Sequence, residues 1–266
     1  MIAELLDRYI NRTPERRRAA IRFWYQLLSR LDTRAVMPFM NYGYVPPEAG
    51  PPLALDPADE PHRSCIQLYH HVAGAIDLRG RDVLEVGCGR GGGAAYIRRY
   101  LGPRSVIGVD FSDQAIRFCA RQPGARFIPG DAEALPLAAD SFDAVVNIES
   151  SHCYTSLERF ATECARVLRP GGALLLADWR PAGGFGVLRA ALHAAGFAIL
   201  REDDITEGVV RALDRDNERK LALIRAHAPP LVAWRFARFA GVRGSPIYER
   251  LRRRELEYRS LVAQVC

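Results

Sequence analysis

Lysine is almost absent from this chain: Lys220 is the only one among 266 residues. The 37 basic residues still outnumber the 31 acidic ones, which gives a net charge of +6 carried almost wholly by arginine. Two arginine runs stand out, at 16–18 and 252–254. Such runs are more typical of solvated helix faces than of nucleic-acid sites, and no recognition motif accompanies them. We therefore expect no nucleic-acid partner.

Long apolar runs are also missing, so we expect no membrane span. The amino terminus continues into a basic segment at 12–22 and lacks the apolar core and cleavage site of a secretory signal. The six cysteines show no CxxC spacing and no clustering with histidine, which argues against a zinc site and a disulfide framework. We expect reduced thiols, a cytoplasmic location and no metal.

The chain does contain a glycine-rich segment at 83–93, in which Glu85 precedes Gly87, Gly89 and Gly91. A short buried strand from Val83 leads into these glycines, and a helix follows until the stop at 102–103. Glycines let a cofactor approach the backbone at the carboxyl end of a sheet. The spacing also satisfies the GxGxxG pattern of dinucleotide-binding proteins, so the pattern alone leaves two cofactor classes open.

Acidic residues at the ends of the next strands distinguish these classes. Asp110 ends an apolar strand at 106–109 and could accept hydrogen bonds from the hydroxyls of an adenosine ribose. A nicotinamide cofactor would use the same acid, so Asp110 alone does not separate the two classes. Asp131 follows the strand at 127–128 and could accept a hydrogen bond from an adenine amino group. With Glu85 they would place three carboxylates around one pocket, which suits an ammonium and a sulfonium better than a pyrophosphate. The sequence therefore predicts S-adenosylmethionine binding.

The rest of the chain alternates strands and helices, which predicts an α/β fold. A fourth strand ends at 147–149, and a capping box of Thr155 and Glu158 predicts a helix that ends near Leu168. The further elements expected are a helix at 113–121, a turn at 169–172, a strand at 173–177, a helix at 188–195, a strand at 198–200, helices at 207–225 and 231–240, and a last strand at 258–263.

We expect one structural domain with three parts. Residues 1–76 form a helical cap, with one helix starting at Thr13, another at 62–76, and an aromatic loop at 38–47 that could close over the cofactor. Residues 77–203 form the cofactor-binding core. Residues 204–266 form a helical lid and the final strand. The aromatic side chains of the lid either pack in the core or line the substrate-binding site.

The combined motifs resemble class I S-adenosylmethionine-dependent methyltransferases. The resemblance rests on the glycine-rich segment, Asp110, 130–132 and 168–172. It implies a Rossmann-like fold with a seven-stranded, mostly parallel sheet, helices on both faces, an amino-terminal helical cap and a lid before the last strand. It also implies S-adenosyl-L-methionine as the methyl donor and S-adenosyl-L-homocysteine as the product.

A finer resemblance comes from the segments 59–62, 147–154 and 177–181, which are similar to mycobacterial phthiotriolone and phenolphthiotriolone dimethyltransferases and to O-methyltransferases of macrolides and sugars. It implies O-methylation of a hydroxyl on a small hydrophobic polyketide, lipid or other secondary metabolite. Nothing in the sequence indicates the oligomeric state.

Site residues follow from these motifs. Methyl transfer to a hydroxyl needs a base, and we expect His152 in that role with Asp178 orienting it, although a strand-terminal acid could instead cap backbone amides. The expected cofactor-binding residues are Tyr42, Glu85, Gly87, Cys88, Gly89, Asp110, Phe111, Asp131, Ala132, Asn147 and Ile148. The expected substrate-binding residues are Tyr44, Glu149, Trp179, Trp234 and Phe239.

Two alternatives remain open. Glu149 could instead serve C-methylation of an alkene or enol, because related enzymes place an acid near a carbocation. The fold could also retain the cofactor only as a scaffold.

Overall fold

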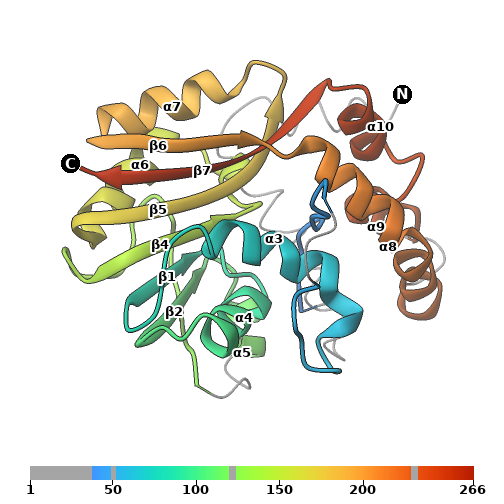
Figure 1. The fold of residues 1–266 in the computed structure, drawn as a ribbon, viewed down its shortest axis with the longest axis horizontal. Helices are drawn as coiled ribbons and strands as arrows, with labels where there is room; N and C mark the ends of the chain where they lie inside the picture. The colour runs from blue at the N-terminus through green and yellow to red at the C-terminus, as the bar shows by residue number, and fades with distance from the viewer. Residues whose placement is uncertain (1–37, 49–51, 120–123, 229–232) are drawn as a thin grey trace.

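A computed structural model describes residues 38–48, 52–119, 124–228 and 233–266. Figure 1 shows a twisted sheet with helices on both sides and a further group of helices at one end. The expected helix at Thr13 and the start of the expected helix at Leu231 lie outside the described residues.

The sheet has seven strands in the order β3-β2-β1-β4-β5-β7-β6. Strands β1 to β5 pair in parallel, whereas β7 runs antiparallel to both β5 and β6. The predicted Rossmann-like class I fold is confirmed. The strands are β1 (Asp82–Val86), β2 (Ser105–Asp110), β3 (Arg126–Pro129), β4 (Phe142–Ile148), β5 (Leu168–Pro181), β6 (Phe197–Asp204) and β7 (Leu256–Val265).

Two hydrophobic clusters fix the helices to opposite faces of the sheet. One joins α3 and α4 to it through Leu68 and Ile97, and the other joins α6 and α7 through Phe160 and Leu188. The side chains of a strand alternate between faces, so neighbours such as Val83 and Leu84 contribute to different clusters. The helices are η1 (Glu60–His62), α3 (Arg63–Ala73), α4 (Gly92–Tyr100), α5 (Asp113–Cys119), η2 (Ser151–Cys153), α6 (Leu157–Val167), α7 (Phe185–Ala194), α8 (Thr206–His227), α9 (Ala233–Ala240) and α10 (Pro246–Arg252).

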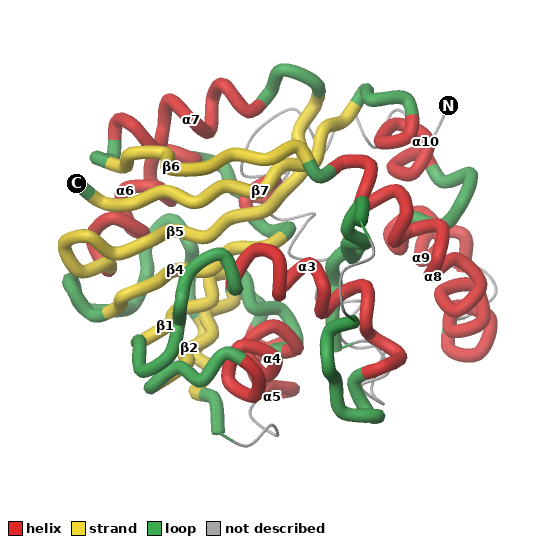
Figure 2. The backbone as a smooth tube through the Cα atoms, viewed as in Figure 1, coloured by secondary structure: helices red, strands yellow, loops and turns green. Residues whose placement is uncertain are grey.

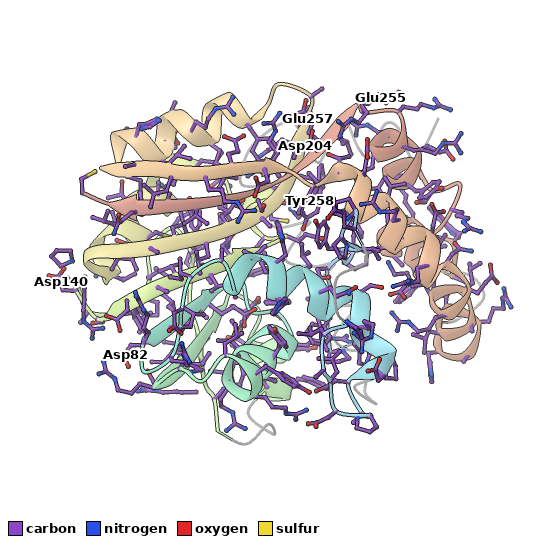
Figure 3. All side chains as sticks on the ribbon, in the orientation of Figure 1. Asp82, Asp140, Asp204, Glu255, Glu257 and Tyr258 are labelled. Atoms are coloured by element: carbon purple, nitrogen blue, oxygen red, sulfur yellow. The ribbon has the colours of Figure 1, made fainter. Side chains whose placement is uncertain are left out.

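Parallel register brings the ends of separate strands to one edge. Val86 pairs with Val109, and Ile148 pairs with Ala177, so the residues that follow β1, β2, β4 and the corresponding part of β5 meet there. Figure 3 shows Asp82 and Asp140, near the starts of β1 and β4, at the opposite end from Tyr258. This edge is where open α/β sheets bind ligands.

Two local predictions are wrong. Ser156, not Thr155, caps α6: its side chain accepts a hydrogen bond from the backbone of Arg159, while the Thr155 hydroxyl bonds to Glu133. The segment 169–172 is not a turn before β5 but an irregular part of that strand, where Gly171 has φ +75° and the register with β4 shifts. The sequence could not show that β4 pairs on both sides of this bulge.

Three helices, α8, α9 and α10, stand between β6 and β7, and we call them the inserted helices (Figure 2). Helix α10 was not predicted; Ser245 caps its start, because the Ser245 hydroxyl accepts a hydrogen bond from the backbone amide of Tyr248. The start of α8 is tied to β7, because the Tyr258 amide donates to the Thr206 hydroxyl at 2.8 Å and the Ile205 amide donates to the Tyr258 carbonyl at 2.9 Å. Among the described residues no helix is long and apolar enough to cross a membrane.

Candidate active site

A cleft of about 940 Å³, including its open mouth, lies at the carboxyl edge of the sheet. Its wall comes from the turns after β1 to β4 and from the loop at 38–41, so it lies where the sequence predicts a cofactor. The lining residues are Pro38, Phe39, Met40, Asn41, Tyr69, Val86, Gly87, Cys88, Gly89, Arg90, Val109, Asp110, Phe111, Gly130, Asp131, Ala132, Glu133, Ile148, Glu149, Ser150, Cys153 and Tyr154.

The glycine turn has no room for side chains. Gly87 has φ +75°, and a Cβ placed there would lie 2.0 Å from Oγ of Ser150. Gly89 has φ +51°, and its Cβ would lie 2.7 Å from Cε of Met40. The amides of Gly87 and Cys88 both donate to the Val109 carbonyl, at 2.8 and 3.0 Å, which holds the turn against β2. Such a turn leaves its backbone accessible to a ligand in the cleft.

Asp110 anchors the same turn from the end of β2. Its carboxylate accepts hydrogen bonds from the amides of Gly89, at 2.8 Å, and Ser112, at 2.9 Å. Burial raises the pKa of Asp110, while these two amides oppose that rise. Each carboxylate oxygen can accept more than one hydrogen bond, so Asp110 can hold the turn and still accept from a ligand hydroxyl.

Glu85 lies behind the turn rather than on the cleft wall. Tyr69 donates to its Oε1 at 2.7 Å, and a Cβ on Gly93 would meet the same oxygen at 2.2 Å. Within the described part of the chain its Oε2 is buried without a hydrogen-bond partner, and burial raises the pKa of Glu85 to about 7. Of the three carboxylates expected around the pocket, Asp110 and Asp131 line it and Glu85 does not.

Two further residues that were expected to bind the cofactor, Asn147 and Tyr42, do not line the cleft. Asn147 is fully buried and donates to the Val86 carbonyl at 2.8 Å and to the Tyr154 hydroxyl at 2.9 Å. Tyr42 is absent from the lining, and its amide donates to Glu149. Both therefore position residues that do line the cleft.

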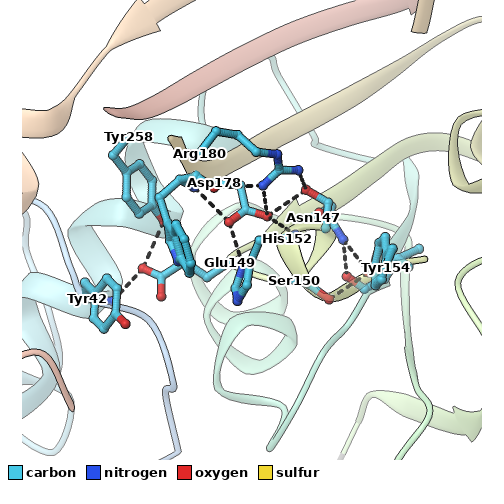
Figure 4. Close-up of polar contacts among 12 residues, drawn as sticks. Tyr42, Asn147, Glu149, Ser150, His152, Tyr154, Asp178, Arg180 and Tyr258 are labelled. Carbon is cyan, nitrogen blue, oxygen red and sulfur yellow. Dashed lines mark hydrogen bonds and ion pairs between the residues drawn. The ribbon is translucent and has the colours of Figure 1, made fainter. Parts of the chain in front are cut away.

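Glu149 follows β4 in a backbone conformation that side chains rarely adopt, with φ +48°. Its Oε1 accepts from the Tyr42 amide at 2.6 Å and from the Tyr258 hydroxyl at 2.9 Å (Figure 4). Burial raises the pKa of Glu149 to about 7, against the opposing effect of the Tyr42 amide. A strained acid with a raised pKa at a cleft wall is a candidate functional group.

His152 and Asp178 form a hydrogen-bonded pair beside the cleft (Figure 4). Nδ1 of His152 lies 2.8 Å from Oδ1 of Asp178, and the His152 amide donates to Oδ2 at 2.8 Å. Asp178 is fully buried, and Ser151 and Arg180 also contact it, at 2.6 and 3.3 Å. A hydrogen bond from Nδ1–H to the carboxylate places the basic lone pair of the imidazole on Nε2.

The electrostatics of this pair follow from its opposite charges. Burial alone would lower the pKa of His152, but the adjacent Cys153 and the Asp178 carboxylate raise it well above the ordinary value. Burial likewise opposes ionisation of Asp178, but His152 and Arg180 hold its pKa well below the usual range. Asp178 is therefore the charged partner that orients and polarises the imidazole.

Of the five expected substrate residues, only Glu149 lines the cleft. Trp179 contacts His152 with ring centres 4.6 Å apart and the ring planes tilted, and Tyr44 is buried with its ring centre 4.7 Å from that of His71. Trp234 and Phe239 lie on α9 with 54% and 38% of their surfaces exposed, and neither lines the cleft. In the described ranges no group of three or more His, Cys, Asp or Glu side chains is placed to hold a metal ion.

Several lining residues were not anticipated. Tyr69, on α3, lines the cleft and donates to Glu85 of β1. Glu133 holds the chain before α6 through the Thr155 amide and hydroxyl, each at 2.7 Å. Ser150, Cys153 and Tyr154 lie in the segment after β4 that carries the finer resemblance, and their position next to His152 was the available signal. Contacts such as that of Tyr69 join distant elements and leave no local pattern.

Comparisons with known proteins identify the family of this chain. The family profile described as "Methyltransferase domain" matches residues 84–176. A phthiotriol/phenolphthiotriol dimycocerosates methyltransferase of Mycobacterium leprae is 40% identical over 244 residues, which cover 90% of this chain and 89% of that protein. The chain belongs to the class I S-adenosylmethionine-dependent methyltransferases. A fatty-acid O-methyltransferase of Mycolicibacterium smegmatis is 40% identical over 226 residues, covering 83% of this methyltransferase and 81% of that one.

A solved structure agrees in fold. The geranyl diphosphate C-methyltransferase of Streptomyces coelicolor A3(2), in complex with S-adenosyl-L-homocysteine, has a TM-score of 0.67 at 16% identity, covering 94% of this chain and 98% of that one. The cofactor of this methyltransferase is S-adenosylmethionine. The cleft fits it chemically, because a glycine turn without room for Cβ atoms lies beside two carboxylates, Asp110 and Asp131.

Proposed function

We propose that this methyltransferase transfers the methyl group to an oxygen atom of a hydrophobic acceptor, namely a hydroxyl of a polyketide, a lipid or a related secondary metabolite. The observation that carries the proposal is the His152–Asp178 pair beside the donor cleft, since an aliphatic hydroxyl needs a base to become a good nucleophile. Two relatives at 40% identity are named for lipid substrates, and the name of one states O-methylation.

The donor would be held by residues of the glycine turn and the strand ends. The backbone of Gly87, Cys88 and Gly89 would face its amino-acid part, and Glu85 and Asn147 would support that turn from behind. Asp110 would accept from the ribose hydroxyls, with Phe111 beside it. Asp131 and Ala132 would contact the adenine, and Ile148 and the Tyr42 loop would enclose the remainder. When bound, the cofactor supplies an electrophilic methyl group on a sulfonium.

His152 would then remove the acceptor proton. Its Nε2 lone pair would accept the hydroxyl proton as the acceptor oxygen bonds to the methyl carbon and the carbon–sulfur bond breaks, which would leave S-adenosyl-L-homocysteine as the thioether product. The buried Asp178 carboxylate would stabilise the resulting imidazolium. Ser151, Arg180 and the Trp179 amide fix that carboxylate, so the imidazole has one orientation. Alignment of the two reacting atoms contributes much of the rate in such displacements.

The acceptor would lie between the Tyr44 loop, Trp179 and the inserted helices. We propose that residues 1–76 and 204–266 act as cap and lid over the core at 77–203. We also propose that the enzyme works in the cytoplasm, which is supported by six cysteines that are all free.

C-methylation is the competing function, and Glu149 favours it. This acid lines the cleft, whereas His152 does not. A carboxylate at that position could stabilise a cation or remove a proton from carbon.

The two functions can be separated by locating the methyl group. The purified enzyme would be incubated with S-adenosylmethionine carrying a labelled methyl and with hydroxylated polyketides, hydroxy fatty acids and their alkene analogues. A product with the label on oxygen, lost in His152→Gln and retained in Glu149→Gln, supports the proposal. A label on carbon, or loss of activity only in Glu149→Gln, overturns it.

A further inference from the structure

One segment of the sequence carries a marked excess of basic over acidic residues. Residues 205–256, which contain the inserted helices, hold twelve of the 37 Lys and Arg residues but only six of the 31 Asp and Glu residues. This excess equals the net charge of +6, so the remaining residues sum to zero. The three helices stand together at one end of the molecule (Figure 1).

Helix α9 presents the aromatic part of this region to solvent. Its inner side packs through Phe236 against Ile224 of α8 and against Val242. Its outer side carries Trp234 and Phe239, exposed by 54% and 38%.

Exposed arginines occur on α9 and near the end of α8. Arg235 and Arg238 are exposed on α9, and the guanidinium of Arg235 lies 5.1 Å from the centre of the Trp234 ring. Arg225 is exposed on α8, one residue after Ile224, which packs against α9. The basic residues of this region therefore include guanidinium groups on the same helix as the exposed aromatic rings.

We propose that the outer face of α9, with Arg225, Arg235 and Arg238, docks on the surface of an anionic lipid bilayer. Tryptophan and phenylalanine insert at the boundary between headgroups and acyl chains, and arginines bind lipid phosphates around them. Each basic residue near such a surface adds electrostatic attraction that falls off over a Debye length. Docking in this orientation brings the inserted helices to the membrane, where a hydrophobic acceptor would be dissolved, whichever atom is methylated.

Co-sedimentation of the full chain with vesicles tests this surface. Vesicles of phosphatidylcholine alone are compared with vesicles that also contain phosphatidylglycerol, at low and high salt. We expect binding only to the anionic vesicles, weakened by salt. Trp234→Ala with Phe239→Ala should reduce it by about tenfold or more, and Arg235→Gln with Arg238→Gln by roughly tenfold.

A matched control uses Val187→Ala with Leu200→Ala, which removes two side chains that are each 61% exposed but lie on α7 and β6. This control should bind as the unchanged protein does, and circular dichroism verifies that each variant folds. Equal binding to neutral and anionic vesicles, no vesicle binding, or binding that the α9 variants leave intact would overturn the proposal. The proposal would also be overturned if the protein bound a DNA duplex instead of vesicles, in a salt-sensitive way that the arginine variant abolished. That result would assign the face to nucleic acid.

Discussion

His152 and Asp178 are 26 residues apart in the sequence and are joined by two hydrogen bonds of 2.8 Å, one from the imidazole and one from the backbone amide. The bond from the backbone amide fixes the position of the His152 main chain, and the bond from Nδ1 fixes the orientation of its ring. Asp178 lies within β5, directly after Ala177, which pairs with Ile148 near the end of β4, and His152 lies in η2 just after β4. Parallel pairing of β4 and β5 therefore produces this contact.

Replacing His152 by Gln should lower turnover by roughly 10²-fold or more while leaving cofactor affinity unchanged, because only the proton acceptor is removed. Steady-state kinetics and calorimetry with S-adenosyl-L-homocysteine measure the two quantities. Undiminished turnover would contradict the role of base.

The pH dependence of turnover should follow the charge of His152. Its pKa is raised, and the protonated form cannot accept a proton, so kcat/KM should fall as the pH drops through that raised value. Asp178→Asn removes one of the negative neighbours that raise the pKa, so the acidic limb should move to lower pH and kcat should fall. A pH profile that does not move in this variant would show that the carboxylate does not govern the titrating group.

Substituting Asp110 by Ala should weaken cofactor binding by about 10- to 100-fold, because it removes a charged acceptor and leaves two turn amides without it. Asp113→Ala is the matched control, since Asp113 is exposed three residues later. Calorimetry with S-adenosyl-L-homocysteine compares the two. Equal affinities would exclude Asp110 from the ribose site.

Two alanine substitutions separate backbone strain from steric exclusion at the glycine turn. Gly80 has φ +70°, and a Cβ placed there would have nothing within 4 Å, so Gly80→Ala should cost only the left-handed strain of about 1–2 kcal/mol. Gly87→Ala adds the clash with Ser150 to this strain, so it should lower the free energy of unfolding by a further ~1–3 kcal/mol. It should also weaken cofactor binding. Urea denaturation measures both stabilities. Equal losses would mean that Ser150 moves aside freely.

Glu85 should make the protein less stable as the pH rises. Its folded-state pKa is about 7 against an ordinary 4.5, so the unfolded chain loses this proton first and stability declines between those values. Glu85→Gln keeps an acceptor for Tyr69 but cannot ionise. It should therefore flatten the decline, by at most ~3 kcal/mol. Unfolding free energies measured across this pH range in both proteins provide the check, and parallel curves would contradict the assignment.

The sequence predicted the elements whose signals are local. An apolar run that contains Glu85 and two that precede Asp110 and Asp131 indicated three strands of a parallel sheet, and the glycine turn indicated the cofactor edge. Family membership and the fold followed correctly from these motifs.

Interactions between distant segments could not be read in the same way. The contact of Tyr258 with Glu149 spans 109 residues and depends on β7 entering the sheet antiparallel beside β5. Glu85 carried the motif signal but lies behind the turn, because burial against Tyr69 is a property of the packed helix α3. Thr155 and Ser156 are both residue types that favour the N-cap of a helix. The Thr155 hydroxyl bonds to Glu133, so Ser156 caps α6 instead.

Strands β6 and β7 pair along most of their lengths, so the two ends of the inserted segment are held close together by the sheet itself. The entropy of closing a loop grows only slowly with its length once its ends are fixed. Segments of different size could therefore occupy this position at small thermodynamic cost. Strands β1 and β2, which carry the glycine turn and Asp110, lie on the other side of β4 and β5 and would keep their pairing unchanged.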